Sequence, residues 1–157
     1  MKIIGNGGHA KVIAPLIEFY GIGYFPYNAG FIAIGDNRAR KREAKNNDDL
    51  RFPVLVSQDA RVSKDAFIGE GTVIMAGVIV QPGVRIGCHV ILNTSCSVDH
   101  DCVIEDYAHI APGAHLCGDV HIGEGTLVGV GVGIAQGAKI PSWCLVKAAR
   151  LDICPTL

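Results

Sequence analysis

The chain has 157 residues, of which 49% are hydrophobic and 18% charged, and its formal net charge at pH 7 is −1. This length allows one good core and a small appended unit, and the near-neutral charge gives no general attraction to nucleic acid or to an anionic membrane. We expect a cytoplasmic protein without a membrane span, because no apolar run reaches the roughly 18 residues that cross a bilayer and no signal-peptide pattern is present.

Residues 1–60 are predicted to form a small, truncated Rossmann-like α/β unit. A short strand at 2–4 leads into Gly5-Asn6-Gly7-Gly8-His9-Ala10, which fits the pattern G-x-G-x-x-G/A, and apolar residues from 12 to 20 then follow at helical spacing. Glycines in such a loop let the backbone approach a phosphate at the positive end of the helix. The same pattern also suits a tight strand-to-helix turn that binds no ligand.

The rest of this unit offers little sheet. Residues 31–34 and 52–56 are the other strand candidates, and Pro15 is expected to kink or shorten the first helix. The basic run 38–42 precedes several acids and is interpreted as a solvated helix start. So small a unit would be marginal alone, and we expect it to depend on the remainder of the chain for stability.

From residue 61 to 157 a six-residue period dominates the chain. One phase carries only Val, Ile or Leu, at Val62, Ile68, Ile74, Val80, Ile86, Leu92, Val98, Ile104, Ile110, Leu116, Ile122, Val128, Ile134, Ile140 and Val146. A second phase, four residues after each of the first fourteen of these positions, carries small or modest residues such as Ala66, Cys96 and Ala114. This period is neither helical nor a simple alternation, and it is typical of a parallel β-helix. Three strands and three glycine-rich turns make a triangular coil of eighteen residues, and about five coils fit.

One turn of the repeat carries Asp99-His100-Asp101 where other turns favour glycine. An imidazole with an ordinary pKa near 6.5 can accept a proton at neutral pH, and a neighbouring carboxylate orients the ring. We interpret His100 as a general base; the alternative is a hydrophilic turn. Gly118 lies eighteen residues later and should stack on the same corner, where its N–H could meet a developing oxyanion, although an ordinary turn glycine explains it too.

The repeat also places His109 on a flat face opposite the corner of His100. A single subunit therefore cannot bring the two side chains together, and we expect a site shared between subunits. His109, His115 and His121 point from successive faces and diverge, which disfavours a γ-carbonic-anhydrase-like zinc hydratase, so no metal is expected. The six cysteines form no CxxC pair.

Four stretches together resemble one family. Residues 5–12, 31–38, 93–104 and 109–120 look like those of the nucleotide-sugar acetyltransferases of the sialic-acid O-acetyltransferase type, which include UDP-4-amino-sugar N-acetyltransferases. The resemblance implies a left-handed β-helix of the hexapeptide-repeat acyltransferases and a homotrimer. It also implies acetyl transfer from acetyl-CoA to a nucleotide-linked amino sugar, most simply a UDP-amino sugar.

By matching position, the resemblance assigns His100 and Asp101 to catalysis, and His109 and Gly118 to acetyl-CoA. Gly5, Gly7, Gly8, His9 and Asn93 would contact the sugar substrate. Two departures concern this chain: residues 21–30 stand where the family carries a longer segment with base-binding aspartates, and residues 140–157 replace the family's usual last coil. The sugar, the nucleotide and the choice of N- or O-acetylation stay open, as does a non-catalytic β-helical binding or assembly protein.

Overall fold

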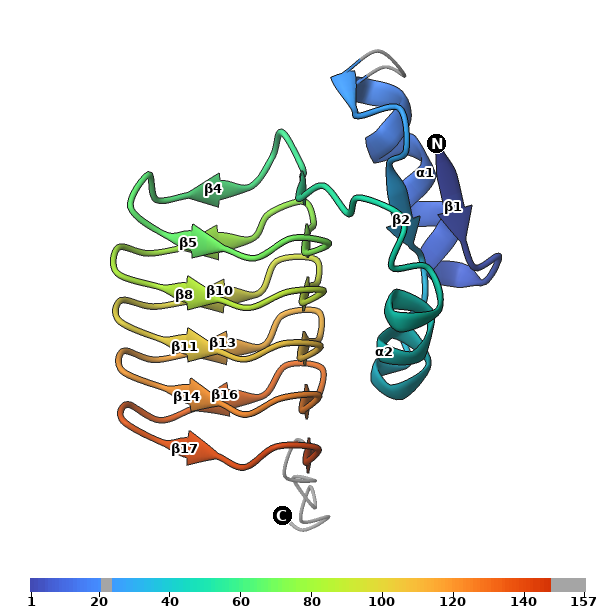
Figure 1. Ribbon diagram of the computed structural model, residues 1–157. Helices are drawn as coiled ribbons and strands as arrows, with labels where there is room; N and C mark the ends of the chain where they lie inside the picture. The colour runs from blue at the N-terminus through green and yellow to red at the C-terminus, as the bar shows by residue number, and fades with distance from the viewer. Residues whose placement is uncertain (21–23, 148–157) are drawn as a thin grey trace, which may run out of the picture.

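The computed structural model describes residues 1–20 and 24–147. A small α/β unit lies beside one face of a long parallel β-helix (Figure 1). In the small unit, β1 (Lys2–Ile4) pairs in parallel with β2 (Gly30–Ile32), with α1 (Gly8–Tyr20) between them and α2 (Asn37–Asn46) after them. Pro15 lies inside α1, which continues past it to Tyr20. Neither described helix is long and apolar enough to cross a bilayer.

The β-helix consists of two-residue strands on three faces. The first face contains β4 (Arg61–Val62), β7 (Ile79–Val80), β10 (Ser97–Val98), β13 (His115–Leu116) and β16 (Gly133–Ile134). The second contains β5 (Phe67–Ile68), β8 (Arg85–Ile86), β11 (Val103–Ile104), β14 (His121–Ile122) and β17 (Lys139–Ile140). The third contains β3 (Leu55–Val56), β6 (Val73–Ile74), β9 (Ile91–Leu92), β12 (His109–Ile110), β15 (Leu127–Val128) and β18 (Leu145–Val146).

Each strand pairs in parallel with the strand one coil away, as Val98 does with Leu116. The predicted eighteen-residue register and the five or so coils are therefore confirmed. The predicted strand at 52–56 reduces to β3, which pairs with β6 on the third face. The β-helix thus begins at Leu55, earlier than the expected boundary at residue 61.

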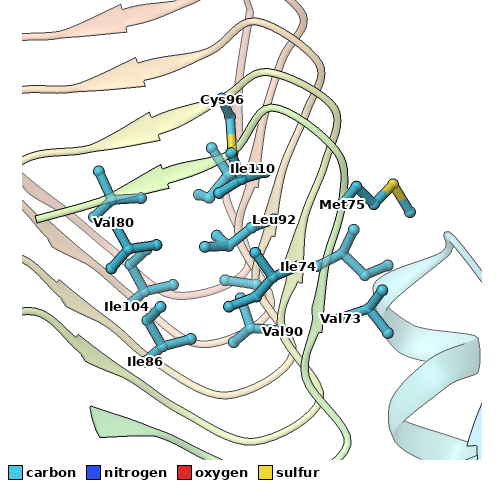
Figure 2. Close-up of a cluster of buried hydrophobic side chains, with 14 of the residues drawn as sticks. Val73, Ile74, Met75, Val80, Ile86, Val90, Leu92, Cys96, Ile104 and Ile110 are labelled. Carbon is cyan, nitrogen blue, oxygen red and sulfur yellow. The ribbon is translucent and has the colours of Figure 1, made fainter. Parts of the chain in front are cut away.

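The core fills the inside of the coils. Inward aliphatic residues from Ile74 to Ile134 are buried, and so are the small residues of the second phase, including Cys96 and Cys102. Figure 2 shows Val80, Ile86 and Ile104 pointing into this interior, whereas Val73 and Met75 point out of it. Those outward residues are buried as well, because the small unit packs on the third face.

A residue with positive φ stands in the turn just before each inward small residue from Thr72 to Cys144. Glycine fills seven of these places, as at Gly71 and Gly125, and six carry a side chain. The six are His89, Ser95, Asp101, Tyr107, Asp119 and Trp143. Each non-glycine residue in the left-handed region costs roughly 1 kcal/mol of stability. These six side chains are therefore expected to serve a purpose other than forming the turn.

The basic start of α2 is only partly solvated, and here the prediction is wrong for Arg40. Its side chain is buried, with 1% of the residue exposed. The guanidinium donates to carbonyl oxygens of both parts of the chain: His89 at 2.8 Å and Tyr107 at 2.7 Å on the β-helix, Ile34 and Gly35 at 3.1 Å in the small unit. Burial lowers the pKa of Arg40 to about 10, which leaves it charged at neutral pH.

Arg40→Met should lower the free energy of unfolding by about 3 kcal/mol, because several buried carbonyl groups lose their donor while the methionine only fills space. Urea unfolding followed by circular dichroism measures the change. Arg42→Met on the same helix is the matched control: its side chain is 66% exposed, and the expected change is within about 0.5 kcal/mol. Equal losses in the two variants would contradict the role of Arg40 as an anchor.

Candidate active site

His100 lies in the turn between β10 on the first face and β11 on the second face. Its Nδ1 is 2.8 Å from Asp101 Oδ2, and both side chains are largely exposed. This hydrogen bond to Asp101 raises the pKa of His100 above its ordinary value, and the nearby carboxylates of Asp99 and Asp119 add to the effect. With Nδ1 held by the carboxylate, Nε2 is the atom available to exchange a proton with a ligand.

Gly118 lies directly beside the imidazole, one coil further along the chain. A Cβ atom built on Gly118 would come within 2.6 Å of His100 Nε2 and Cε1, so the ring keeps its place only because this residue has no side chain. The φ angle of Gly118 is not in the left-handed region. Clearance for the ring, rather than backbone conformation, is therefore the reason for glycine here.

A second group of predicted residues meets on the third face. His109 Nε2 is 3.0 Å from Asn93 Nδ2, and the rings of His9 and His109 lie 6.1 Å apart between centroids in an edge-to-face arrangement. Asn93 Oδ1 accepts a hydrogen bond from the Thr94 N–H at 2.8 Å, which leaves its NH₂ group facing the imidazole. His109 Nε2 must then accept that bond, so the hydrogen-bond pattern assigns the ring proton to Nδ1.

Both histidines of this group are held neutral. Burial lowers the pKa of His109 to about 4, with the charge of Arg40 and the neighbouring His9 acting in the same direction. Burial and Arg40 likewise lower the pKa of His9, whose Nε2 is buried without a hydrogen-bond partner among the described residues. His109 is thus a fixed, uncharged hydrogen-bonding group rather than a surface titrating residue.

The glycine loop opens next to this group. Gly5 has a φ of +108°, and a Cβ atom there would lie 2.8 Å from the Ala33 carbonyl oxygen, so the close packing of β1 on the segment after β2 requires glycine. Gly7 and Gly8 face open space, since nothing stands within 4 Å of where their Cβ atoms would be. The loop therefore leaves room at the N-terminus of α1, beside His9.

The two groups lie on opposite sides of one chain. The corner of His100 joins the first and second faces. His109 lies on the third face and Asn93 in the turn that follows β9 of that face, where the His109 ring meets His9 of the small unit. Within a single chain the structure thus joins His100 with Asp101 and Gly118, and joins His9 with Asn93 and His109. It does not bring the first group to the second.

The other outward histidines have partners of their own. His115 Nδ1 is 2.9 Å from Ser97 Oγ, and His121 Nε2 is 2.8 Å from Glu105 Oε1. With His109 held by Asn93, the three evenly spaced imidazoles diverge as the sequence predicts. In the described part of the chain, no three His, Cys, Asp or Glu side chains gather as a metal site requires.

Sequence reasoning assigned no role to two aromatic side chains where α2 docks, the buried His89 and the half-buried Tyr107. The ring of His89 stacks on Tyr107, with centroids 5.4 Å apart, and the backbone carbonyls of both accept hydrogen bonds from Arg40. Both residues have positive φ. A signal was present, since each replaces the glycine that the repeat favours at that turn position.

A family model described as bacterial transferase hexapeptide (six repeats) matches residues 101–136. A comparison with curated protein sequences finds no significant match.

Solved structures give broader matches. The acetyltransferase domain of PglB from Neisseria gonorrhoeae, solved in complex with acetyl coenzyme A, is 33% identical; the match covers 92% of this chain and 85% of that chain, with a TM-score of 0.84. PerB from Caulobacter crescentus, solved in complex with CoA and GDP-perosamine, is 29% identical over 92% of this chain and 84% of that chain, with a TM-score of 0.85. WeeI from Acinetobacter baumannii, at 21% identity and a TM-score of 0.68, shares the fold. With a relative above 30% identity matching along most of both chains, this chain belongs to the hexapeptide-repeat sugar acetyltransferases that its sequence resembles.

Proposed function

We propose that the protein transfers an acetyl group from acetyl-CoA to the amino group of a nucleotide-linked amino sugar, with a site shared between subunits of a homotrimer. The observation that carries this proposal is the exposed imidazole of His100, oriented by Asp101 at 2.8 Å, with Gly118 against its ring. The relatives support the choice of substrates, because one was solved with acetyl coenzyme A and another with CoA and GDP-perosamine. A UDP-amino sugar remains our first candidate acceptor.

In the proposed reaction the amine nitrogen attacks the carbonyl carbon of the thioester. His100 Nε2 takes the proton that the nitrogen loses, while Asp101 stabilises the resulting imidazolium. The Gly118 N–H, which makes no backbone hydrogen bond to the described residues, donates to the developing oxyanion. The C–S bond then breaks, and the thiolate of CoA leaves with the proton from His100. No acyl-enzyme is needed.

The placement of the two groups supports a shared site. His100 lies at the corner between the first and second faces. Asn93, His109 and the glycine loop lie on the opposite side, at the third face. A substrate held by the glycine loop of one chain therefore reaches the His100 imidazole only if a second chain supplies it. A closed threefold ring of subunits repeats this contact three times with the same geometry.

The purified protein should release CoA thiol from acetyl-CoA only when a nucleotide-linked amino sugar is present, and His100→Ala should slow this release by roughly 10²- to 10⁴-fold. The rate should fall as the pH drops through the raised pKa of His100, because only the neutral ring accepts a proton. Asp101→Asn should move this acidic limb to lower pH and reduce the rate. No thiol release with any amino sugar of a UDP, GDP and dTDP panel would contradict the proposed reaction.

Gly118→Ala should reduce the rate of acetyl transfer by roughly 10- to 100-fold without loss of fold, because the new methyl group displaces the His100 ring. Gly133→Ala is the matched control: it lies one coil later on the same face as β13, its φ is not left-handed, and nothing stands within 4 Å of its Cβ position. Thiol release and thermal unfolding are measured for both. Full activity of the Gly118→Ala variant would contradict a role of this residue in the active site.

Coexpression of His100→Ala with His109→Ala should restore activity to about a quarter of the wild-type rate, although each variant alone is inactive. In every mixed trimer one boundary joins an intact His100 to an intact His109, and random assembly leaves a quarter of all boundaries in that state. The mixture is measured against each variant alone after gel filtration of the trimer. A mixture as inactive as its components would place the whole site within one chain.

A further inference from the structure

The outer side of α2 carries a row of basic residues that the proposed reaction does not use. The row recurs at helical spacing, so its members lie on one side of the helix, away from the buried Arg40. Together with two further side chains it lines a hollow of about 450 Å³, within the usual range for small-molecule sites. The lining residues are Arg38, Lys41, Arg42, Lys45, Asn46 and Trp143.

The charge of this hollow is strongly positive although the whole chain carries a formal charge of −1. Lys41 forms an ion pair with Glu124, and Arg42 Nε lies 3.6 Å from Glu43 Oε1. Arg38 and Lys45 have no ion-pair partner among the described residues. Two cations are therefore free to meet an anion that enters the hollow.

Trp143 is placed here against the preference of the repeat. Its φ is +60°, at a turn position that seven other turns fill with glycine. Gly125, one coil earlier, makes room for the indole, because a Cβ atom there would lie 2.4 Å from the ring. Since Trp143 is only partly buried, core packing does not explain the strain. The Arg38 guanidinium lies 4.6 Å from the indole centroid, so a cation and an aromatic surface meet at one edge of the hollow.

We propose that this hollow binds a phosphorylated nucleoside, with the base against Trp143 and the phosphates on Arg38 and Lys45. A plain anion would need only the basic residues, whereas a nucleoside also uses the indole, since every base has a flat face that stacks on aromatic rings. Guanidinium groups suit phosphate because they present several donors in one plane.

The ligand class rests on the proposed function. Both proposed substrates carry such a group: CoA ends in adenosine 3′,5′-bisphosphate, and the sugar is linked to a nucleoside diphosphate. The hollow suits the part that both substrates share, a base with adjacent phosphates. The binding experiment decides whether that part comes from CoA or from the nucleotide sugar.

Trp143 is the only tryptophan in the chain, so its fluorescence reports on the hollow directly. Titration with adenosine 3′,5′-bisphosphate and, separately, with UDP should give a saturable change with at least one of them. Unphosphorylated adenosine and inorganic phosphate should each bind at least tenfold more weakly. The tighter of the two nucleotides identifies the source. Equal responses to nucleotide and to inorganic phosphate, or no saturable response, would overturn the proposal.

Charge-removing variants test whether Arg38 and Lys45 bind the phosphates directly or only add to the net positive charge of the protein. Arg38→Ala and Lys45→Ala should each weaken nucleotide binding at least fivefold, and should reduce its dependence on salt concentration. Arg61→Ala is the matched control, because it removes one exposed positive charge from β4, on a face that α2 does not cover. A loss of affinity as large in Arg61→Ala would show that net charge alone governs the binding.

Trp143→Gly tests the indole without imposing strain, because glycine is the usual residue at this turn position. The variant should keep its thermal unfolding temperature and lose at least tenfold in nucleotide affinity, measured by isothermal titration calorimetry. Unchanged affinity would overturn the role of the ring. These experiments measure binding and not activity. A protein that binds nucleotide in the hollow but transfers no acetyl group would therefore refute only the proposed reaction. An active protein whose nucleotide affinity is unchanged in these variants would refute only the proposed binding in the hollow.

Discussion

The return of each coil onto the previous one after eighteen residues is the constraint on which the rest of the structure depends. Two-residue strands gain stability by pairing with the strands of the neighbouring coils, so every coil must keep the same length. Residues eighteen positions apart are consequently neighbours, as the pairing of Ser97 with His115 illustrates. The place of Gly118 against the His100 ring follows from the same spacing. The repeat therefore builds the core and also aligns His100, the proposed general base, with the glycine that gives its ring room.

The same repeat explains where strain collects. Its turns demand a left-handed residue, and glycine meets that demand at no steric cost. Where the chain instead uses His89, Asp101, Tyr107 or Trp143, the side chain has another task. Asp101 orients His100, while His89 and Tyr107 lie where α2 docks, with their carbonyls accepting from Arg40. The costs are small individually, and these four of the six strained positions lie at the candidate sites or the docking surface.

Sequence reasoning succeeded where the period decides the outcome and failed where two separate elements meet. The inward aliphatic ladder, the coil length and the stacking of Gly118 on His100 all follow from spacing within one repeat. The buried state of Arg40 does not, because it depends on how α2 docks against coils that lie 49 and 67 residues away along the chain. The contact between His9 and His109 had the same origin. For both, the flat third face looked open in sequence, and the small unit covers it.

The docking of α2 is itself unusual, and it accounts for the basic hollow. This helix buries only Arg40 and Ala44, so it has almost no apolar surface with which to bind the β-helix. A guanidinium that donates to several backbone carbonyls takes the place of a hydrophobic stripe, because those carbonyls would otherwise lie buried without donors. Arg38, Lys41, Arg42 and Lys45 then remain on the outer side at fixed positions relative to Trp143. A helix held mainly by a buried guanidinium can thus present Arg38 and Lys45, which have no ion-pair partner among the described residues, to a ligand without losing its place on the fold.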